Sequence, residues 1–129
     1  MPEPQVHELR LVLTLDDVEG AVRIFRDVLG MPEVPAVSSP GGRIAILEAG
    51  RATLELADAA HAAYIDDVEV GHRSAGPVRI AVGVSEVRVQ SERLVEAGLP
   101  AVAPPTPTPF GSVNSRFALP GGLQLTLFG

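Results

Sequence analysis

The chain begins with an alternation of apolar and polar residues. Leucine occupies positions 9, 11, 13 and 15, and the residues between them include Glu8, Arg10 and Thr14. Side chains of a strand point alternately to its two faces. The stretch from His7 to Leu15 therefore predicts a strand whose leucines share one face and whose Arg10 lies on the other.

A helical pattern follows this strand. Asp16 and Asp17 are candidate N-caps, and Glu19 stands three residues after Asp16, as in a capping box. Gly30 is placed for a left-handed C-terminal cap, and Pro32 then stops the helix. One apolar face is predicted to pack inward, formed by Val18, Ala21, Val22, Phe25, Val28 and Leu29.

Three further strands are predicted before residue 58. They cover Glu33 to Val37, Arg43 to Glu48 and Ala52 to Ala57, and turns rich in proline and glycine separate them. The order of elements in residues 1–57 is thus β-α-β-β-β.

The same order recurs in residues 78–129. Val78 to Val84 predicts a strand, and Ser85 can cap a helix from Glu86 to Ala97. Val87, Leu94 and Val95 would pack inward from this helix. Three short strands complete the half: Ala101 to Ala103, Ser112 to Leu119, and Leu123 to Phe128.

Spacing relates the two halves. A Gly-x-Pro motif ends each predicted helix, at Gly30 and at Gly98, and Arg10 and Arg79 occupy equivalent positions in the first strand of each half. An internal repeat of this kind predicts tandem modules. We expect an α+β fold in which modules 1–57 and 78–129 form one structural domain.

Residues 58–77 link the modules. The alanine-rich segment Ala59 to Ile65 favours a short helix, and the acidic residues Asp66, Asp67 and Glu69 are predicted to be solvated. Gly71, Ser74 and Gly76 suggest a flexible joint. We expect a homodimer, and a linker of this length would allow one module to pair with a second chain and give an exchanged dimer.

Composition excludes several classes of function. Cysteine is absent, which removes disulfides, thiolate metal sites and cysteine nucleophiles, and all ten basic residues are arginine, so no lysine can form a Schiff base. The net charge of −6 argues against nucleic acid binding. Neither a signal peptide nor a membrane-spanning apolar run is visible, and we expect a cytoplasmic protein.

Several segments carry a family resemblance. Asp17 to Gly30 is similar to the helix pattern D-[LV]-E-x-A-x-x-F-Y-x-x-x-L-G, Arg51 to Leu56 to a fourth strand, and Thr108 to Ser112 with Leu119 to Leu125 to a terminal loop and last strand. In order and spacing, the chain resembles the vicinal oxygen chelate superfamily, also called the glyoxalase/bleomycin-resistance/extradiol-dioxygenase group. The resemblance implies a cup of curved mixed sheets, with helices outside and a ligand in the concavity.

Enzymes of this superfamily hold a divalent metal with one ligand from each of four strands, usually two His and two Glu. The resemblance places these positions at Arg10, Glu55, Arg79 and Thr126. Arginine has no lone pair for a metal, and threonine is a poor neutral ligand. His7 would lie on the opposite face of an unbulged strand. We therefore expect neither a metal nor another cofactor.

A charge cluster is predicted instead. Arg10, Glu55 and Arg79 would meet at the floor of the cup, where the arginines should lower the pKa of Glu55. Two interpretations stay open. The cluster could simply fill the former ligand positions, or a spare arginine could bind an anionic or carbonyl oxygen of a ligand.

Further candidate binding residues lie near the C-terminus. Phe110 follows a stiff proline-rich loop and would either stack on a flat ligand or fill its own core. Asn114 and Arg116 would point into the cup or lie on a solvated strand edge. In the linker, His61 and Tyr64 would rim a neighbouring subunit's site or belong to a helix outside the sheet.

Three functions remain from the sequence. The first is a metal-free, glyoxalase- or bleomycin-resistance-like protein that binds a small apolar or aromatic molecule, as antibiotic-binding members do. The second is a metal-dependent glyoxalase- or dioxygenase-type enzyme, or a metal-free variant that uses Glu55 as a base. The third is a dimeric accessory interaction module. The ligand positions favour the first.

Overall fold

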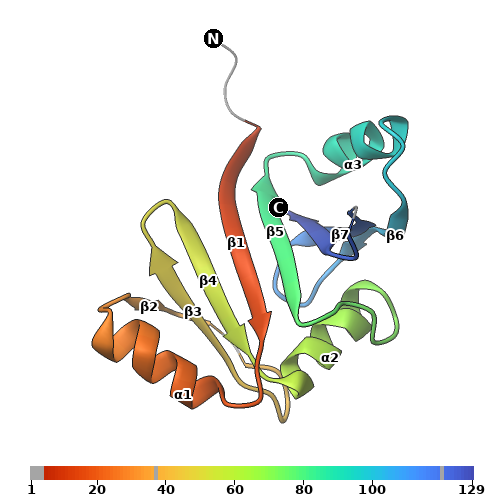
Figure 1. The fold of residues 1–129 in the computed structure, drawn as a ribbon. Helices are drawn as coiled ribbons and strands as arrows, with labels where there is room; N and C mark the ends of the chain where they lie inside the picture. The colour runs from red at the N-terminus through yellow and green to blue at the C-terminus, as the bar shows by residue number, and fades with distance from the viewer. Residues whose placement is uncertain (1–4, 37, 120) are drawn as a thin grey trace.

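The two modules form one continuous mixed sheet. The computed structural model describes residues 5–36, 38–119 and 121–129. The first module contributes β1 (Val6–Thr14), β2 (Glu33–Val34), β3 (Ile44–Ala49) and β4 (Ala52–Ala57). The second contributes β5 (Val78–Val84), β6 (Ala101–Pro107), β7 (Val113–Ala118) and β8 (Gln124–Phe128). The strand order β2-β3-β4-β1-β5-β8-β7-β6 confirms the α+β class and the paired modules (Figure 1).

The modules join through their first strands. β1 pairs with β5 in antiparallel fashion, whereas β1 runs parallel to β4 and β5 runs parallel to β8. This arrangement is what a two-fold relation between two βαβββ units produces. Both modules of a single chain thus contribute to the same sheet.

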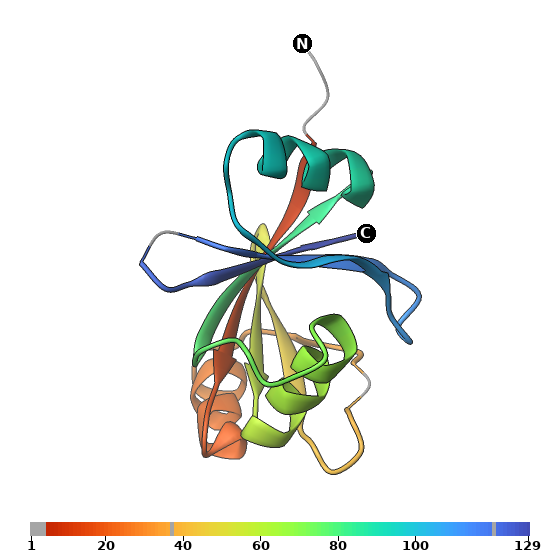
Figure 2. The ribbon, with the colours of Figure 1, turned by 90° about the vertical axis from the view of Figure 1, so that its right-hand side faces the viewer.

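The three helices do not all lie outside the sheet. In Figure 2, α1 (Val18–Val22) and α2 (Ala59–Glu69) lie on opposite sides of β3 and β4, and α3 (Val87–Glu96) and α2 lie on opposite sides of the β6–β8 half. The linker helix α2 therefore occupies the angle between the two halves of the sheet. The expectation of a helix packed on the outside is wrong for α2.

No helix in the described part of the chain is long and apolar enough to span a membrane.

The first helix differs from its sequence pattern. Asp17 is the N-cap and accepts a hydrogen bond from Gly20 N at 2.9 Å, while Glu19 pairs with Arg43 instead of completing a capping box. After Val22 the chain widens into a π-helical turn, Arg23–Val28. A wider turn rotates the following side chains away from the helical stripe. Val28 and Leu29, predicted to pack inward, are consequently 70% and 63% exposed.

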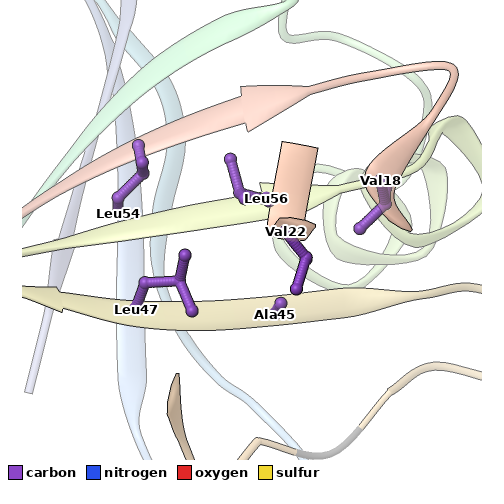
Figure 3. Packing of buried hydrophobic residues seen from close by; sticks show 6 residues of the cluster. All are labelled: Val18, Val22, Ala45, Leu47, Leu54 and Leu56. Atoms are coloured by element: carbon purple, nitrogen blue, oxygen red, sulfur yellow. The ribbon is translucent and has the colours of Figure 1, made fainter. Parts of the chain in front are cut away.

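One hydrophobic cluster lies between α1 and the first module's strands (Figure 3). Its buried members are Val18, Val22, Ala45, Leu47, Leu54 and Leu56, and Phe25 packs against them. Burial of each leucine contributes about 1.5–3 kcal/mol. A second cluster fixes α3 to the other module and comprises Val84, Val87, Phe117 and Leu127. Each module thus has its own hydrophobic core on the outer face of the sheet, and neither core occupies the inner face.

Element boundaries need some corrections. α3 begins at Val87 after Glu86, which makes no side-chain capping bond, so Ser85 is not the cap, and Val95 is 56% exposed. β6 continues through the proline run to Pro107, because an edge strand tolerates residues that cannot donate a ladder hydrogen bond. β2 covers only Glu33–Val34 of the strand predicted there, and its predicted end at Val37 lies outside the described residues.

Candidate ligand-binding cavity

A cavity of about 950 Å³ lies on the inner face of the sheet. Side chains from β1, β4, β5 and β8 line its floor, α2 forms one wall, and the segments before β3 and around Phe110 complete it. Of the sequence-predicted site residues, six line this cavity: Arg10, Glu55, Arg79, Phe110, Asn114 and Thr126.

Strand register relates the four positions that the family resemblance assigns to metal ligands. Arg10 lies opposite Ala81, and Val12 opposite Arg79, so the two arginines are exchanged by the two-fold relation between β1 and β5. In the neighbouring strands, Glu55 pairs with Val12 and Thr126 pairs with Ala81. Glu55 and Thr126 are therefore equivalent as well, and all four positions face the same cavity.

Glu55 is a buried carboxyl group with little compensation. Glu55 is 8% exposed, and its nearest cation is Arg10, whose Nη1 lies 3.8 Å from Glu55 Oε1. No residue of the described chain donates a hydrogen bond to the Glu55 carboxyl group. Burial raises the pKa of Glu55, and the charges of Arg10 and Arg79 only partly oppose this effect. The predicted lowering of the pKa is wrong, because neither arginine approaches closely enough to replace lost hydration.

Arg10 is already held by its own surroundings. Its Nε donates to Glu8 on the same strand, and its guanidinium carbon lies 4.3 Å from the centre of the Phe128 ring. This cation–π contact and the Glu8 pair hold the guanidinium near the edge of the floor.

Arg79 points toward β8. Its Nη1 donates to Thr126 Oγ1 at 2.8 Å, and Thr126 in turn donates to Glu69 Oε1 at 3.3 Å. Burial lowers the pKa of Arg79, whereas the charges of Glu69 and Glu55 raise it. The guanidinium remains charged. The predicted cluster therefore divides into an Arg10–Glu55 pair on one side and an Arg79–Thr126–Glu69 chain on the other.

The acidic segment of the linker is not solvated as predicted. Asp66 and Glu69 are only 1% and 5% exposed, although Asp67 between them is exposed. Glu69 accepts hydrogen bonds from Arg116 Nη2 at 2.8 Å and from Asn114 Nδ2 at 2.9 Å. Both donors come from β7, so these contacts attach α2 to the second module.

Asp66 makes the second attachment. It accepts from Arg116 Nη1 at 2.8 Å and from the backbone N–H groups of Ser74 and Ala75 at 2.7 and 3.0 Å. Burial alone would raise the pKa of Asp66, but these hydrogen bonds and one from Arg73 outweigh it and lower the pKa. The carboxylate therefore stays ionised and fixes the segment after α2.

Arg116 serves this attachment and lies outside the cavity lining. Its side chain is fully buried, and its donors bind Asp66, Glu69 and Gln124. Asn114 lines the cavity, but its amide is also engaged, by Glu69 and by Ser112 Oγ. The sequence could not reveal these roles, because the carboxylate partners lie 45 to 50 residues away in the chain.

An aromatic pair lies on the α2 side of the cavity. Phe110 is 46% exposed, and its ring meets that of Tyr64 edge to face, with centroids 6.1 Å apart. Phe110 thus has an aromatic neighbour from the linker helix. Because α2 turns inward, Tyr64 and His61 border the cavity of their own chain.

His61 is a buried polar group on the same wall. It is 4% exposed, and its Nδ1 lies 2.9 Å from Ser39 Oγ and accepts from Ser39 N at 3.4 Å. Accepting at Nδ1 leaves the neutral ring with its proton on Nε2. Burial lowers the pKa of His61. The charge of Asp58 acts in the opposite direction, and the charge of Arg79 lowers the pKa further.

The donor set does not fit the divalent metal of the family's enzymes. Two of the four positions hold arginines, one holds a threonine, and only Glu55 offers a carboxylate. Within the described residues, no group of three or more His, Cys, Asp or Glu side chains could hold a metal ion. The register of β1 against β5 shifts between Val6 and Glu8, so the strand is not regular at His7 as the sequence interpretation assumed. The His7 ring lies beside Gly83 and joins no such group.

These features define a two-module protein whose paired sheet surrounds a cavity of small-molecule size. The family model described as Glyoxalase/Bleomycin resistance protein/Dioxygenase superfamily matches residues 9–127. The chain belongs to this superfamily, which confirms the resemblance drawn from the sequence.

Solved structures share the fold at low sequence identity. A hypothetical protein from Bacillus halodurans is 17% identical with a TM-score of 0.68, and the match covers 95% of this chain and 91% of that one. Methylmalonyl-CoA epimerase from Mycobacterium tuberculosis is 19% identical with a TM-score of 0.64, covering 96% and 86%. A superfamily member from Vibrio splendidus is 15% identical with a TM-score of 0.60, covering 93% and 96%. None of the curated proteins matches.

Proposed function

We propose that this protein binds a small molecule with an apolar or aromatic body in the cavity, without a metal ion. The observation that carries the proposal is the floor of the cavity, which is lined by Arg10, Glu55, Arg79 and Thr126. The family resemblance assigns the metal ligands to these four positions. The floor therefore offers charge and hydrogen bonds to a ligand in place of metal coordination.

The walls suit such a ligand. The volume of about 950 Å³ lies within the roughly 300–1,000 Å³ common for small-molecule sites. Ile44, Ile46 and Ile65 supply apolar surface, and the edge-to-face pair of Tyr64 and Phe110 can extend to a third ring. The apolar walls would contact the body of such a ligand, and the polar side chains of the floor would contact its polar end.

A fluorescence titration tests this proposal directly. We expect the dye 8-anilinonaphthalene-1-sulfonate to bind saturably to the folded protein and to raise its melting temperature. Tyr64 is the only tyrosine and tryptophan is absent, so intrinsic emission reports on the cavity wall alone and should change with the same midpoint.

Two neighbouring alanines on α2 provide a matched pair of variants. Ala62 lines the cavity, whereas Ala63 is exposed and does not. Ala62→Phe should weaken dye binding at least tenfold, and Ala63→Phe should leave it unchanged. Equal affinities in the two variants would contradict a ligand site in the cavity.

A second candidate is a metal-free enzyme that uses Glu55 as a base. The raised pKa of Glu55 and the lack of a hydrogen bond to it within the described residues favour this reading, since a base works best when its pKa approaches the working pH. Exchange of the α-proton of an α-keto ester in D₂O, followed by NMR, tests it. Equal exchange rates in wild type and Glu55→Gln would exclude Glu55 as the base.

A further inference from the structure

One edge of the Arg79 guanidinium has no partner. Nη1 is engaged by Thr126 at 2.8 Å, but Nε and Nη2 donate to no residue of the described chain. Arg79 also forms no ion pair within that part of the chain. Two parallel N–H donors on a fixed, charged group are thus unused.

These donors are open to the cavity. Arg79 is half-buried and lines the cavity floor. Among the described residues, the only sealed side-chain nitrogen or oxygen without a hydrogen-bond partner is Thr53 Oγ1. Nε and Nη2 of Arg79 are therefore reachable by water or by a ligand.

Another arginine of this chain shows which group binds the same edge of a guanidinium. In Arg116, the same two donors, Nε and Nη2, both reach Glu69 Oε1, at 3.2 and 2.8 Å. A carboxylate is the usual partner for the side edge of a guanidinium, and such paired, charged hydrogen bonds are stronger than a single neutral one.

No side chain supplies that carboxylate to Arg79. Glu69 is engaged by Arg116 and Asn114, and it reaches Arg79 only through Thr126. Glu55 lies closest to Arg10. A partly desolvated cation that lacks a direct ion pair would gain one from an incoming anion. The two carboxyl groups near Arg79 favour a monoanion over a doubly charged phosphate.

We propose that the ligand of the cavity is an organic acid whose carboxylate binds the Nε and Nη2 edge of Arg79 while its apolar body packs against the walls. This inference rests on the proposed function, because it specifies the chemical class of the ligand. Thr126 has a positioning role: its hydroxyl group fixes Nη1 and so aims the free edge into the cavity.

Isothermal titration calorimetry with two matched probes tests the inference by measuring the affinity for each. 2-Naphthoate and 2-naphthamide have the same ring system and differ in charge at one group. We expect wild type to bind the acid at least tenfold more tightly than the amide. Arg79→Gln should abolish this preference by weakening the binding of the acid. The affinity for the amide should stay within about twofold of wild type.

Two further variants keep the test decisive. Arg51→Gln changes an arginine in the exposed turn between β3 and β4 and should alter neither affinity. If Arg79→Gln does not fold, Arg79→Lys keeps the charge without the planar edge, and it should reduce the preference for the acid.

The outcomes separate the two proposals. Failure of both probes to bind wild type would overturn the proposed function and this inference with it. Equal binding of acid and amide, or a preference for the acid that persists in the Arg79 variant, would overturn only the assignment of the carboxylate to Arg79.

Discussion

Replacing Arg116 with methionine tests whether buried ion pairs hold α2 in the cup. The side chains of Arg116, Asp66 and Glu69 are 0%, 2% and 3% exposed. After the replacement, Asp66 keeps its bonds from Ser74, Ala75 and Arg73, whereas Glu69 keeps only those from Asn114 and Thr126. The cost should therefore fall mainly on Glu69.

The expected loss follows from these remaining contacts. Removing one partner of a buried ion pair costs about 3–5 kcal/mol. Because both carboxylates keep some hydrogen bonds, we expect the lower value, about 3 kcal/mol. For a domain of this size, such a loss lowers the melting temperature by about 10 °C.

Urea unfolding followed by circular dichroism measures this loss. Arg43→Met is the matched control, because Arg43 pairs at 2.7 Å with Glu19, whose side chain is 69% exposed. An exposed pair of this kind contributes less than about 1 kcal/mol. The double variant Arg116→Met/Glu69→Gln should recover part of the loss, since a neutral amide costs less to bury than an unpaired carboxylate.

Acrylamide quenching supplies an independent readout. Tyr64 lies on α2 and is the only tyrosine, so release of the helix should increase its quenching in Arg116→Met under native conditions. A loss of stability no larger than that of Arg43→Met would refute the reasoning. A large loss with unchanged quenching would show that the pairs stabilise the core without holding the helix.

Three shorter predictions concern titration and metals. Glu55→Gln should be more stable than wild type at pH 7, because the raised pKa of Glu55 penalises its charged form in the fold; the difference should vanish below about pH 4, where the wild-type carboxyl is protonated in both states. His61 has a lowered pKa, so it should cost wild type stability as the pH falls below about 6.5, and urea midpoints of His61→Gln should lack this part of the decline. Titration with Zn²⁺, Mn²⁺, Fe²⁺ or Ni²⁺ should leave the melting temperature unchanged, and a stoichiometric stabilisation would contradict the assignment of the four floor positions.

Much of the fold is visible in the sequence because its signals are local. The Gly-x-Pro motifs end both outer helices, and Gly30 and Gly98 have φ angles of +76° and +88°, as left-handed caps require. The spacing places Arg10 and Arg79 at equivalent positions of the two first strands, and the pairing of β1 with β5 exchanges these positions. Alternation and spacing are properties of neighbouring residues, so one sequence suffices to read them.

The position of α2 is not visible in this way. Its inner side carries His61, Asp66 and Glu69, so burial produces no apolar stripe. An acidic segment is usually solvated, and only the partners on β7 make it otherwise. Arg116 and Asn114 are distant in the sequence, and nothing local to either pattern indicates that they meet.

The two halves of the cavity floor have diverged in a way that explains the unused edge of Arg79. In the first module, Arg10 and Glu55 lie on neighbouring strands and pair directly. In the second, Thr126 stands at the position equivalent to Glu55, and the carboxylate comes from α2 as Glu69. Glu69 contacts Arg116 directly and reaches Arg79 only through Thr126. The edge of Arg79 that has no partner among the described residues thus faces the cavity, where a bound anion would complete its hydrogen bonds.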